Sequence, residues 1–428
     1  MINKELNADE LITIIKENFK QIKDVRQRKP RIELSDVLMS GFAMFSLKDP
    51  SLLAFDQKRV HDPNLQDIYK IEKIPSDTQM RTILDEISPE EIRPIYSEVL
   101  NKVKRTKEFK NFMFMDEYCL LSIDGTGMFS SQNNRNEQCL TKKRKTGDIT
   151  YYQQLLGAVI VHPDHKEVIP LMPEPIIKQD GINKNDCERN AAKRLMPKIK
   201  ADHGDLKFII IEDGLGSNAP HIKDIERQGW QYIIGAKEGD HKYLFQQLKE
   251  REDVQIVEIK EGKVLHRFKY VNKVMLNESN KDVIVNFVYY EEIGDKKTRR
   301  FSWVTNIDIN NSNVYKLMRG GRARWKIENE TFNTLKNQGY NLEHNYGLGK
   351  NHLSTMFATL MMLAFCVDQI QQLCSKLFKG ALKRLGSKRA LWEAIRSAFN
   401  MLRVSTFKMI YELLYYGLNH QAPIILRC

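Results

Sequence analysis

Three acidic residues, far apart in the sequence, have the chemistry of a metal centre. Asp124 follows an apolar run in LLSIDGTG (120–127), and Asp213 follows another in FIIIEDGLGS (208–217). We expect each aspartate to close a strand, where a rigid backbone holds its carboxylate next to solvent. An Asp-Gly pair after an apolar run is also one of the commonest turn signals, so neither aspartate is decisive alone.

Glu328 is the third candidate, in the segment RARWKIENETFNTLK (322–336). Arg324 and Glu328 are one turn apart on a helix and share a face. A solvated Arg–Glu pair would contribute only about 0.3–0.5 kcal/mol, but this segment is unusually rich in Arg, Trp and Asn. Glu330 points to another face of the helix and is the competitor for the same role.

Taken together, the three carboxylates suit phosphodiester chemistry. Magnesium is a hard cation that prefers carboxylate oxygens. Two such ions about 3.5–4 Å apart can activate an attacking hydroxyl and stabilise a leaving oxygen. Nearby Arg and Lys side chains would hold the phosphate backbone, and an aromatic ring such as that of Trp303 or Trp325 could stack on an unpaired base or pack in the core.

The elements that must position these acids change along the chain. Residues 1–112 have helical periodicity and form a candidate DNA-binding or dimerisation domain, or a plain helical scaffold. Residues 113–249 read as three strands in a meander, a helix over 186–199, and then strand, helix and strand. This is an α/β order in which helices cover the central strands.

The second half of the chain interrupts this order. Residues 250–305 alternate apolar and charged positions without helical periodicity and predict a β-rich insertion. The core resumes over 306–347, with one long helix predicted from about 312 to 337. Residues 348–428 again read as helical and carry many basic side chains.

The positive charge is concentrated at the end of the chain. The net charge is +12, and residues 301–428, with 17 basic and 7 acidic side chains, account for +10 of it. An acidic partner is implied, most commonly nucleic acid. The run Lys142-Lys143-Arg144-Lys145 is equally well explained as a DNA contact or as a solvated loop.

Composition excludes several other classes of protein. The N-terminus MINKELNADEL lacks the apolar core of a signal peptide. The longest apolar run, 356–367, is shorter than the roughly 20 residues that span a bilayer, so we expect no membrane partner. The six cysteines form no CxxC pair, which favours reduced thiols in the cytoplasm.

The order of these motifs resembles the DDE transposases of bacterial insertion sequences over roughly residues 115–350. It is most similar to the group whose RNase H-like core carries a β-rich insertion before the catalytic glutamate. The strongest motif is Arg324-Trp325-x-Ile327-Glu328. The resemblance implies an α/β fold: an RNase H-like mixed sheet flanked by helices, an all-β insertion, and helical N- and C-terminal regions.

The resemblance also implies roles for individual residues. The metal-binding catalytic triad would be Asp124, Asp213 and Glu328, holding two Mg²⁺ ions or, alternatively, Mn²⁺. The DNA contacts would be Arg322, Arg324, Trp325 and Lys336, together with Lys142, Lys143 and Arg144. Many members have a tyrosine three residues before the motif arginine and a lysine seven after the glutamate. Here these positions are Gly321 and Leu335, with Lys336 one residue later, which weakens any inference of excision through a DNA hairpin.

The implied function is DNA transposition in the bacterial cytoplasm. The protein would bind the terminal inverted repeats of its element as a homodimer on double-stranded DNA. It would cleave the strand at the end of the element, and the freed 3′-hydroxyl would attack target DNA. Two alternatives stay open: a nuclease with the same core that does not join DNA, and a transposase-derived DNA-binding protein without catalysis.

Overall fold

The N-terminal part of the chain is helical, as predicted. The structure is a computed structural model that describes residues 6–27, 30–58, 63–178, 185–417 and 425–426. Helix α5 starts at a capping box, in which Ser76 and Gln79 each accept the other's backbone N–H. The helices of this part are α1 (Ala8–Phe19), α2 (Leu34–Ser46), α3 (Leu52–Lys58), α4 (Pro63–Tyr69), α5 (Asp77–Asp85), the 3₁₀ turn η1 (Pro89–Ile92), α6 (Arg93–Lys104) and α7 (Lys107–Lys110).

The core sheet has the mixed topology of an RNase H-like fold. Its strand order is β2-β3-β1-β6-β7, and the short strands β4 and β5 also pair with β3. Strand β1 is antiparallel to β3 and parallel to β6, which is parallel to β7. The elements are β1 (Tyr118–Ser131), β2 (Leu140–Lys143), β3 (Ile149–Val161), β4 (Ile169–Pro170), β5 (Glu174–Ile176), α8 (Glu188–Asp202), β6 (Lys207–Glu212), α9 (Ala219–Arg227), β7 (Gln231–Gly235) and α10 (Lys242–Glu250).

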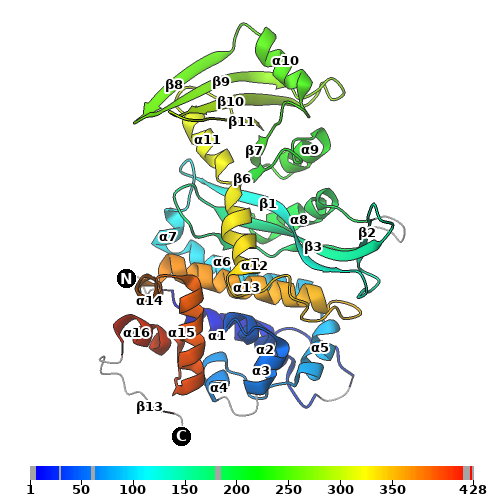
Figure 1. Ribbon diagram of the computed structural model, residues 1–428, viewed down its shortest axis with the longest axis vertical. Helices are drawn as coiled ribbons and strands as arrows, with labels where there is room; N and C mark the ends of the chain where they lie inside the picture. Colours follow the sequence, from blue (N-terminus) through cyan, green and yellow to red (C-terminus); the bar gives the residue numbers. More distant parts are fainter. Residues whose placement is uncertain (1–5, 28–29, 59–62, 179–184, 418–424, 427–428) are drawn as a thin grey trace.

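The β-rich insertion forms four strands, as predicted, but it is not a separate sheet. Strand β11 pairs antiparallel with β7, with Trp303 opposite Gly235, so the insertion extends the core sheet to eleven strands. Figure 1 shows these strands above the core, with helix α10 packed against them. They are β8 (Gln255–Glu261), β9 (Val264–Met275), β10 (Ile284–Ile293) and β11 (Thr298–Thr305).

The prediction of one continuous helix over 312–337 is wrong. Helix α11 (Val314–Arg322) ends at a turn, a π-helical segment follows (Ile327–Phe332), and α12 (Asn333–Asn337) completes the path. At the turn, the Arg324 carbonyl accepts a hydrogen bond from Ser122 Oγ of β1 (3.3 Å). The helical path is therefore attached to the core sheet at its irregular point, and π turns of this kind often occur at functional sites.

Helix α13 is the central core helix. By length and composition it could cross a membrane, but nearly all of its side chains are buried inside the protein. It packs against α2 on one side and β4 on the other, between the N-terminal helices and the sheet (Figure 1). The C-terminal elements are α13 (Leu353–Cys374), α14 (Lys376–Leu385), α15 (Lys388–Met401), β12 (Leu402–Arg403), α16 (Phe407–Tyr416) and β13 (Ile425–Leu426).

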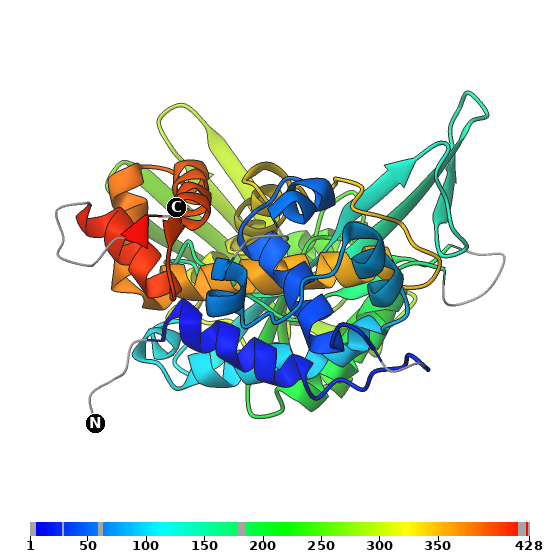
Figure 2. The ribbon, with the colours of Figure 1, turned by 90° about the horizontal axis from the view of Figure 1, so that it is seen from below.

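Strands β1, β2 and β3 also form an arm that leaves the body of the protein, seen clearly in Figure 2. Strand β1 continues to Ser131, which pairs with Tyr151 of β3, and β2 continues the ribbon with Lys143 opposite Ile149. The side chains from Lys142 to Asp148 are exposed. The predicted basic run therefore lies at the tip of this arm.

Candidate active site

The register of two parallel strands brings the two aspartates together. The last parallel pair of β1 and β6 joins Ser122 to Ile211, and Asp124 and Asp213 each lie two residues beyond it. Asp213 directly follows β6, as predicted. The expectation that Asp124 closes its strand is wrong, because β1 continues to Ser131. Asp124 instead lies where β1 has lost its parallel neighbour but keeps its antiparallel partner β3.

Arg324 connects Glu328 to Asp124. The Arg324 Nη1 atom is 2.6 Å from Glu328 Oε1 and 3.3 Å from Asp124 Oδ2. The expected Arg–Glu pair is therefore present, and it is also bonded to an aspartate from a distant strand. Glu330 lies in a different electrostatic environment, where its charge acts on Lys326 and Lys388.

A glycine in β3 fixes the π-helical segment against the sheet. Gly157 is the cross-strand partner of Asp124, and a Cβ atom at this position would lie 2.9 Å from the Phe332 ring. The missing side chain lets Phe332 rest on the sheet next to Asp124, on the same face. Because Phe332 and Glu328 belong to the same π-helical segment, this contact fixes the height of Glu328 above the strand ends.

The carboxyl group of Asp124 is in an unusual electrostatic state. Burial raises its pKa to about 7, against the opposing effects of the Gly125 N–H, which donates to Oδ1 at 2.9 Å, and of Arg324. The charges of Glu328 and Glu188 add to the rise. A half-buried acid with a strongly raised pKa, placed in a cleft beside further acids, is typical of a functional site.

The sequence did not single out Glu188, which the structure places in this cluster. Glu188 is the first residue of helix α8 and lines a cavity of about 40 Å³ with Asp124, Glu212 and Asp213. Burial and the charges of Asp213 and Glu212 raise its pKa. Acids are common in the first turn of any helix, so the local sequence carried no signal that would distinguish this one.

Glu212, next to Asp213, has a histidine as its partner. Its Oε2 atom lies 2.7 Å from Nε2 of His221 on α9. Burial of the ring opposes protonation, but the carboxylate nevertheless raises the pKa of His221. On the other side of the loop, Ser217 Oγ is 2.7 Å from His241 Nε2. These buried contacts hold both ends of the loop that carries Asp213.

The donor atoms fit a hard divalent cation. Carboxylate oxygens are the ligands that Mg²⁺ and Mn²⁺ prefer, and Asp124, Asp213, Glu188 and Glu328 supply them at one end of the sheet. Within the described ranges, no three Asp, Glu, His or Cys side chains stand close enough together to hold a metal as they are arranged. The Arg324 guanidinium takes the position between Asp124 and Glu328.

A larger cleft of about 580 Å³ opens beside the acids, between the core and the insertion. Of the predicted DNA contacts, Arg322, Arg324 and Trp325 line it, together with Asp213. The Trp325 ring is 43% exposed, whereas the nearby Trp303 is only 5% exposed. Trp325 is therefore the more accessible of these two tryptophans, and the Lys326 ammonium lies 5.2 Å from the centroid of its ring.

Gly321 explains why Trp303 is buried. A Cβ atom at Gly321 would lie 2.5 Å from the Trp303 Nε1 atom, so the indole uses the space that a side chain would fill there. The ring also stacks on Phe301, with 5.8 Å between the centroids. Trp303 thus has a packing role between the insertion and α11.

The other predicted DNA contacts lie outside the cleft or at its edge. Lys336 on α12 forms an ion pair with Glu343 at 2.7 Å. Arg322, at the edge of the cleft, pairs with Glu292 and lies over the Phe301 ring. Three others, Lys142, Lys143 and Arg144, are exposed on the β-hairpin arm. Arg144 also donates a hydrogen bond to the Thr150 hydroxyl.

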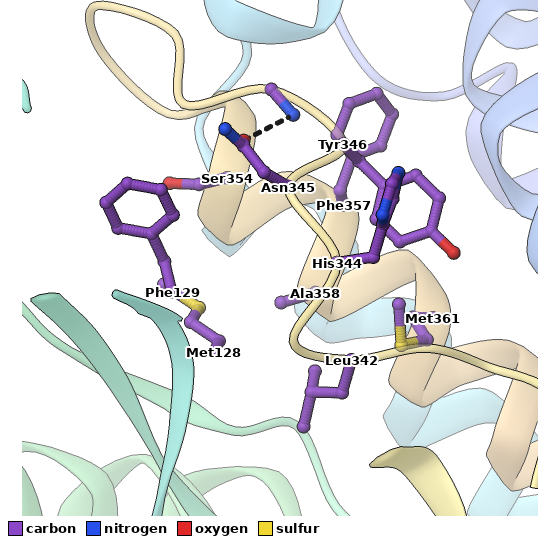
Figure 3. A pocket seen from close by; sticks show the side chains of 11 residues that line it. Met128, Phe129, Leu342, His344, Asn345, Tyr346, Ser354, Phe357, Ala358 and Met361 are labelled. Carbon is purple, nitrogen blue, oxygen red and sulfur yellow. Dashed lines mark hydrogen bonds between the residues drawn. The ribbon is translucent and has the colours of Figure 1, made fainter. Parts of the chain in front are cut away.

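A third cavity contains no candidate catalytic residue. Figure 3 shows this space of about 20 Å³ between β1, the segment 342–347 and helix α13. Its lining is mainly apolar, with Met128, Phe357 and Met361 among the side chains. The cavity marks the place where the chain after α12 packs back against β1.

A comparison with known proteins identifies the family of this chain. A family model described as "Transposase DDE domain" matches residues 116–366, which is more than half of the chain. No curated protein matches the sequence. Among solved structures, the NurA nuclease from Sulfolobus solfataricus is similar at 13% identity and a TM-score of 0.24, covering 54% of this chain and 82% of the nuclease. That similarity is too low to support an argument. The family model is sufficient by itself: this chain belongs to the DDE transposase family.

Proposed function

We propose that this transposase cleaves DNA at the ends of its own element and joins the freed 3′-hydroxyl to target DNA. Asp124, Asp213 and Glu328 form the catalytic triad in this proposal. The observation that carries it is the convergence of three acids from β1, β6 and the π-helical segment at one end of the sheet. The shared strand register and the guanidinium of Arg324 account for this convergence.

The reaction consists of two phosphoryl transfers. In the first, a water oxygen attacks the phosphorus at the element's end, the P–O3′ bond breaks, and the 3′ oxygen leaves as a hydroxyl. In the second, this hydroxyl attacks a target phosphodiester, a new P–O bond forms, and the target 3′ oxygen leaves. Both steps need the same charge distribution, so one site can serve them in turn.

The carboxylates would hold two Mg²⁺ or Mn²⁺ ions, which supply Lewis-acid activation of the attacking oxygen and stabilise the leaving oxygen. The protein itself contributes positioning and charge. Arg324 contacts both Asp124 and Glu328, and it would turn its guanidinium toward a DNA phosphate when these acids bind cations. Trp325, one residue further, offers an exposed face for an unpaired base beside the cleft.

DNA would extend from the cleft along the β-hairpin arm. Seven residues separate Asp124 from Ser131, or about 23 Å of strand, and the tip with Lys142, Lys143 and Arg144 lies a few residues further, at about 30 Å. This length corresponds to about nine base pairs of B-DNA. We therefore propose that the arm contacts the duplex about one helical turn from the cleaved phosphate.

The basic C-terminal region divides into two groups of side chains. Lys383 and Arg389 are exposed and available to DNA. Arg384 is also exposed, but its guanidinium donates to the Leu414 and Tyr415 carbonyls at the end of α16, and Lys388 is only partly exposed, near Asp368. We propose that DNA contacts in this region come from Lys383 and Arg389, and that the protein acts as a homodimer on DNA in the bacterial cytoplasm.

The test uses isosteric variants and a DNA duplex that carries one end of the element. We expect Asp124→Asn, Asp213→Asn and Glu328→Gln to lose Mg²⁺-dependent cleavage by a factor of at least roughly 10³ while binding the duplex with nearly unchanged affinity. Glu330→Gln is the matched control, because it removes a neighbouring carboxylate that does not meet Arg324. An active Glu328→Gln variant, or a dead Glu330→Gln variant, would show that the assignment of the glutamate is wrong.

A second assay separates joining from cleavage. A precleaved end with a free 3′-hydroxyl is supplied together with a target duplex, and joined products are measured. Cleavage without joining would refute the transposition reaction and identify a nuclease. Absence of both reactions in Mg²⁺ and Mn²⁺ would identify a DNA-binding protein without catalysis.

A further inference from the structure

We propose that Glu188 is a fourth carboxylate ligand for the divalent cations of this active site. The inference rests on the proposed triad and extends it, because the DDE pattern contains no acid at the start of the helix that follows the meander. It concerns the cavity that Glu188 lines together with Asp124 and Asp213.

The backbone of β1 is adapted to Glu188. A Cβ atom at Gly125 would lie 2.1 Å from Glu188 Oε1 and 2.6 Å from its Cδ, so only glycine lets this carboxylate approach the strand. The N–H of Gly125 donates to Asp124 Oδ1 at 2.9 Å. The carboxylate of Glu188 therefore rests against the peptide that also orients Asp124.

The cavity shared by these acids has room for an ion. It measures about 40 Å³, more than the space that a single water needs, and Glu188, Asp124 and Asp213 all line it. Arg189 lines it as well, but it forms no ion pair with Glu188 among the described residues. The lining thus contains several carboxylates beside a volume larger than a single water needs.

The charges in this cavity are only partly balanced. Asp124 forms an ion pair with Arg324, and Glu212 contacts the imidazole of His221. In the part of the chain that the structure describes, Glu188 and Asp213 have no cationic partner. Two acids without counter-charge, beside a third, destabilise one another, and a divalent cation between them would remove this repulsion.

An ordinary helix-capping role makes a different prediction. A first-turn glutamate that only complements the helix dipole should stabilise the protein slightly and have no effect on metal binding. A metal ligand held among like charges should lower stability in the metal-free protein and raise it when a cation binds. Stability and metal affinity measured together therefore separate the two roles.

The test measures Mn²⁺ affinity directly, by electron paramagnetic resonance of the free ion, in Glu188→Gln, in Asp213→Asn and in the wild-type full chain. We expect Glu188→Gln to bind Mn²⁺ at least about tenfold more weakly, with a metal-free melting temperature equal to or above that of the wild type. Glu10→Gln, which removes a first-turn acid of α1 far from the site, is the matched control and should leave Mn²⁺ affinity unchanged.

The outcomes distinguish this inference from the proposed function. Wild-type Mn²⁺ affinity in Glu188→Gln, with weakened binding in Asp213→Asn, overturns the role of Glu188 and leaves the triad standing. Unchanged affinity in both variants overturns the metal site as a whole. A lower melting temperature of Glu188→Gln with unchanged affinity assigns Glu188 to helix capping and also overturns the inference.

Discussion

Replacing Asp124 with asparagine should stabilise the metal-free protein. The substitution keeps the shape of the side chain and the hydrogen bond from the Gly125 N–H, and Arg324 keeps its contact with Glu328. It removes a charge whose pKa is raised from 3.8 to about 7 because the group is buried. The proposed catalytic site thus contains a charge that the fold would be more stable without.

The size and the pH dependence of this effect follow from linkage. Folding raises the pKa of Asp124, so ionisation costs folding free energy: the cost is absent below pH 3.8, grows up to about pH 7 and is constant above it. At about 1.36 kcal/mol per pH unit, the full shift corresponds to roughly 4 kcal/mol. The Asp124 side chain is 25% exposed, so we expect about half of this value, or roughly 2 kcal/mol, at about pH 8.

The assay is thermal unfolding of wild-type protein and Asp124→Asn at about pH 5.5 and about pH 8, with and without Mg²⁺. Without metal, the variant should melt at a higher temperature, and its advantage should be larger at the higher pH. Added Mg²⁺ should raise the melting temperature of the wild type more than that of the variant. A variant that is less stable at the higher pH, or an advantage that does not depend on pH, would refute this account of Asp124.

Two further predictions concern regions outside the catalytic centre. Asp368→Asn should lower the free energy of unfolding by about 3–5 kcal/mol in urea titrations, because it leaves the buried Lys48 ammonium without its carboxylate partner. A variant of the arm with Lys142, Lys143 and Arg144 replaced by alanine should bind the element's end more weakly. Its salt slope should be lower by about 0.9 for each phosphate that the arm no longer neutralises. The same variant should lose hydroxyl-radical protection about one helical turn from the cleaved phosphate, and unchanged protection there would show that the basic run serves only solubility.

The sequence predicted much of the sheet because its signals are local. Apolar runs that end in acidic turns located β1, β6 and Asp213, and the four alternating segments of the insertion became β8 to β11. The Gly125-Thr126-Gly127 sequence was misleading, because it reads as a turn but continues as a strand. In the structure Gly125 admits a carboxylate at close range, which is a tertiary reason for glycine that no local pattern reveals.

The parts of the site that were not predictable depend on contacts between distant segments. The Arg324–Glu328 pair could be predicted from its spacing, but the bond from Arg324 to Asp124 joins residues 200 positions apart. Glu188 is conspicuous only once the fold has brought the start of α8 against Gly125 of β1. Lys336 matched a pattern of basic residues near the glutamate, but in the structure its ammonium pairs with Glu343.

The pairing of β11 with β7 determines what the cleft can do. Because Trp303 lies opposite Gly235 and packs against Gly321, the insertion is attached both to the strand next to β6 and to the helix that leads to Glu328. A free hinge between insertion and core would break both contacts. The cleft wall is therefore fixed relative to Asp213 and Glu328 before DNA binds, and DNA that enters must adapt to it. Of the side chains that line the cleft, those of Trp325 and Arg324 lie next to the acids, so we expect adjustment to the substrate in these two neighbouring side chains.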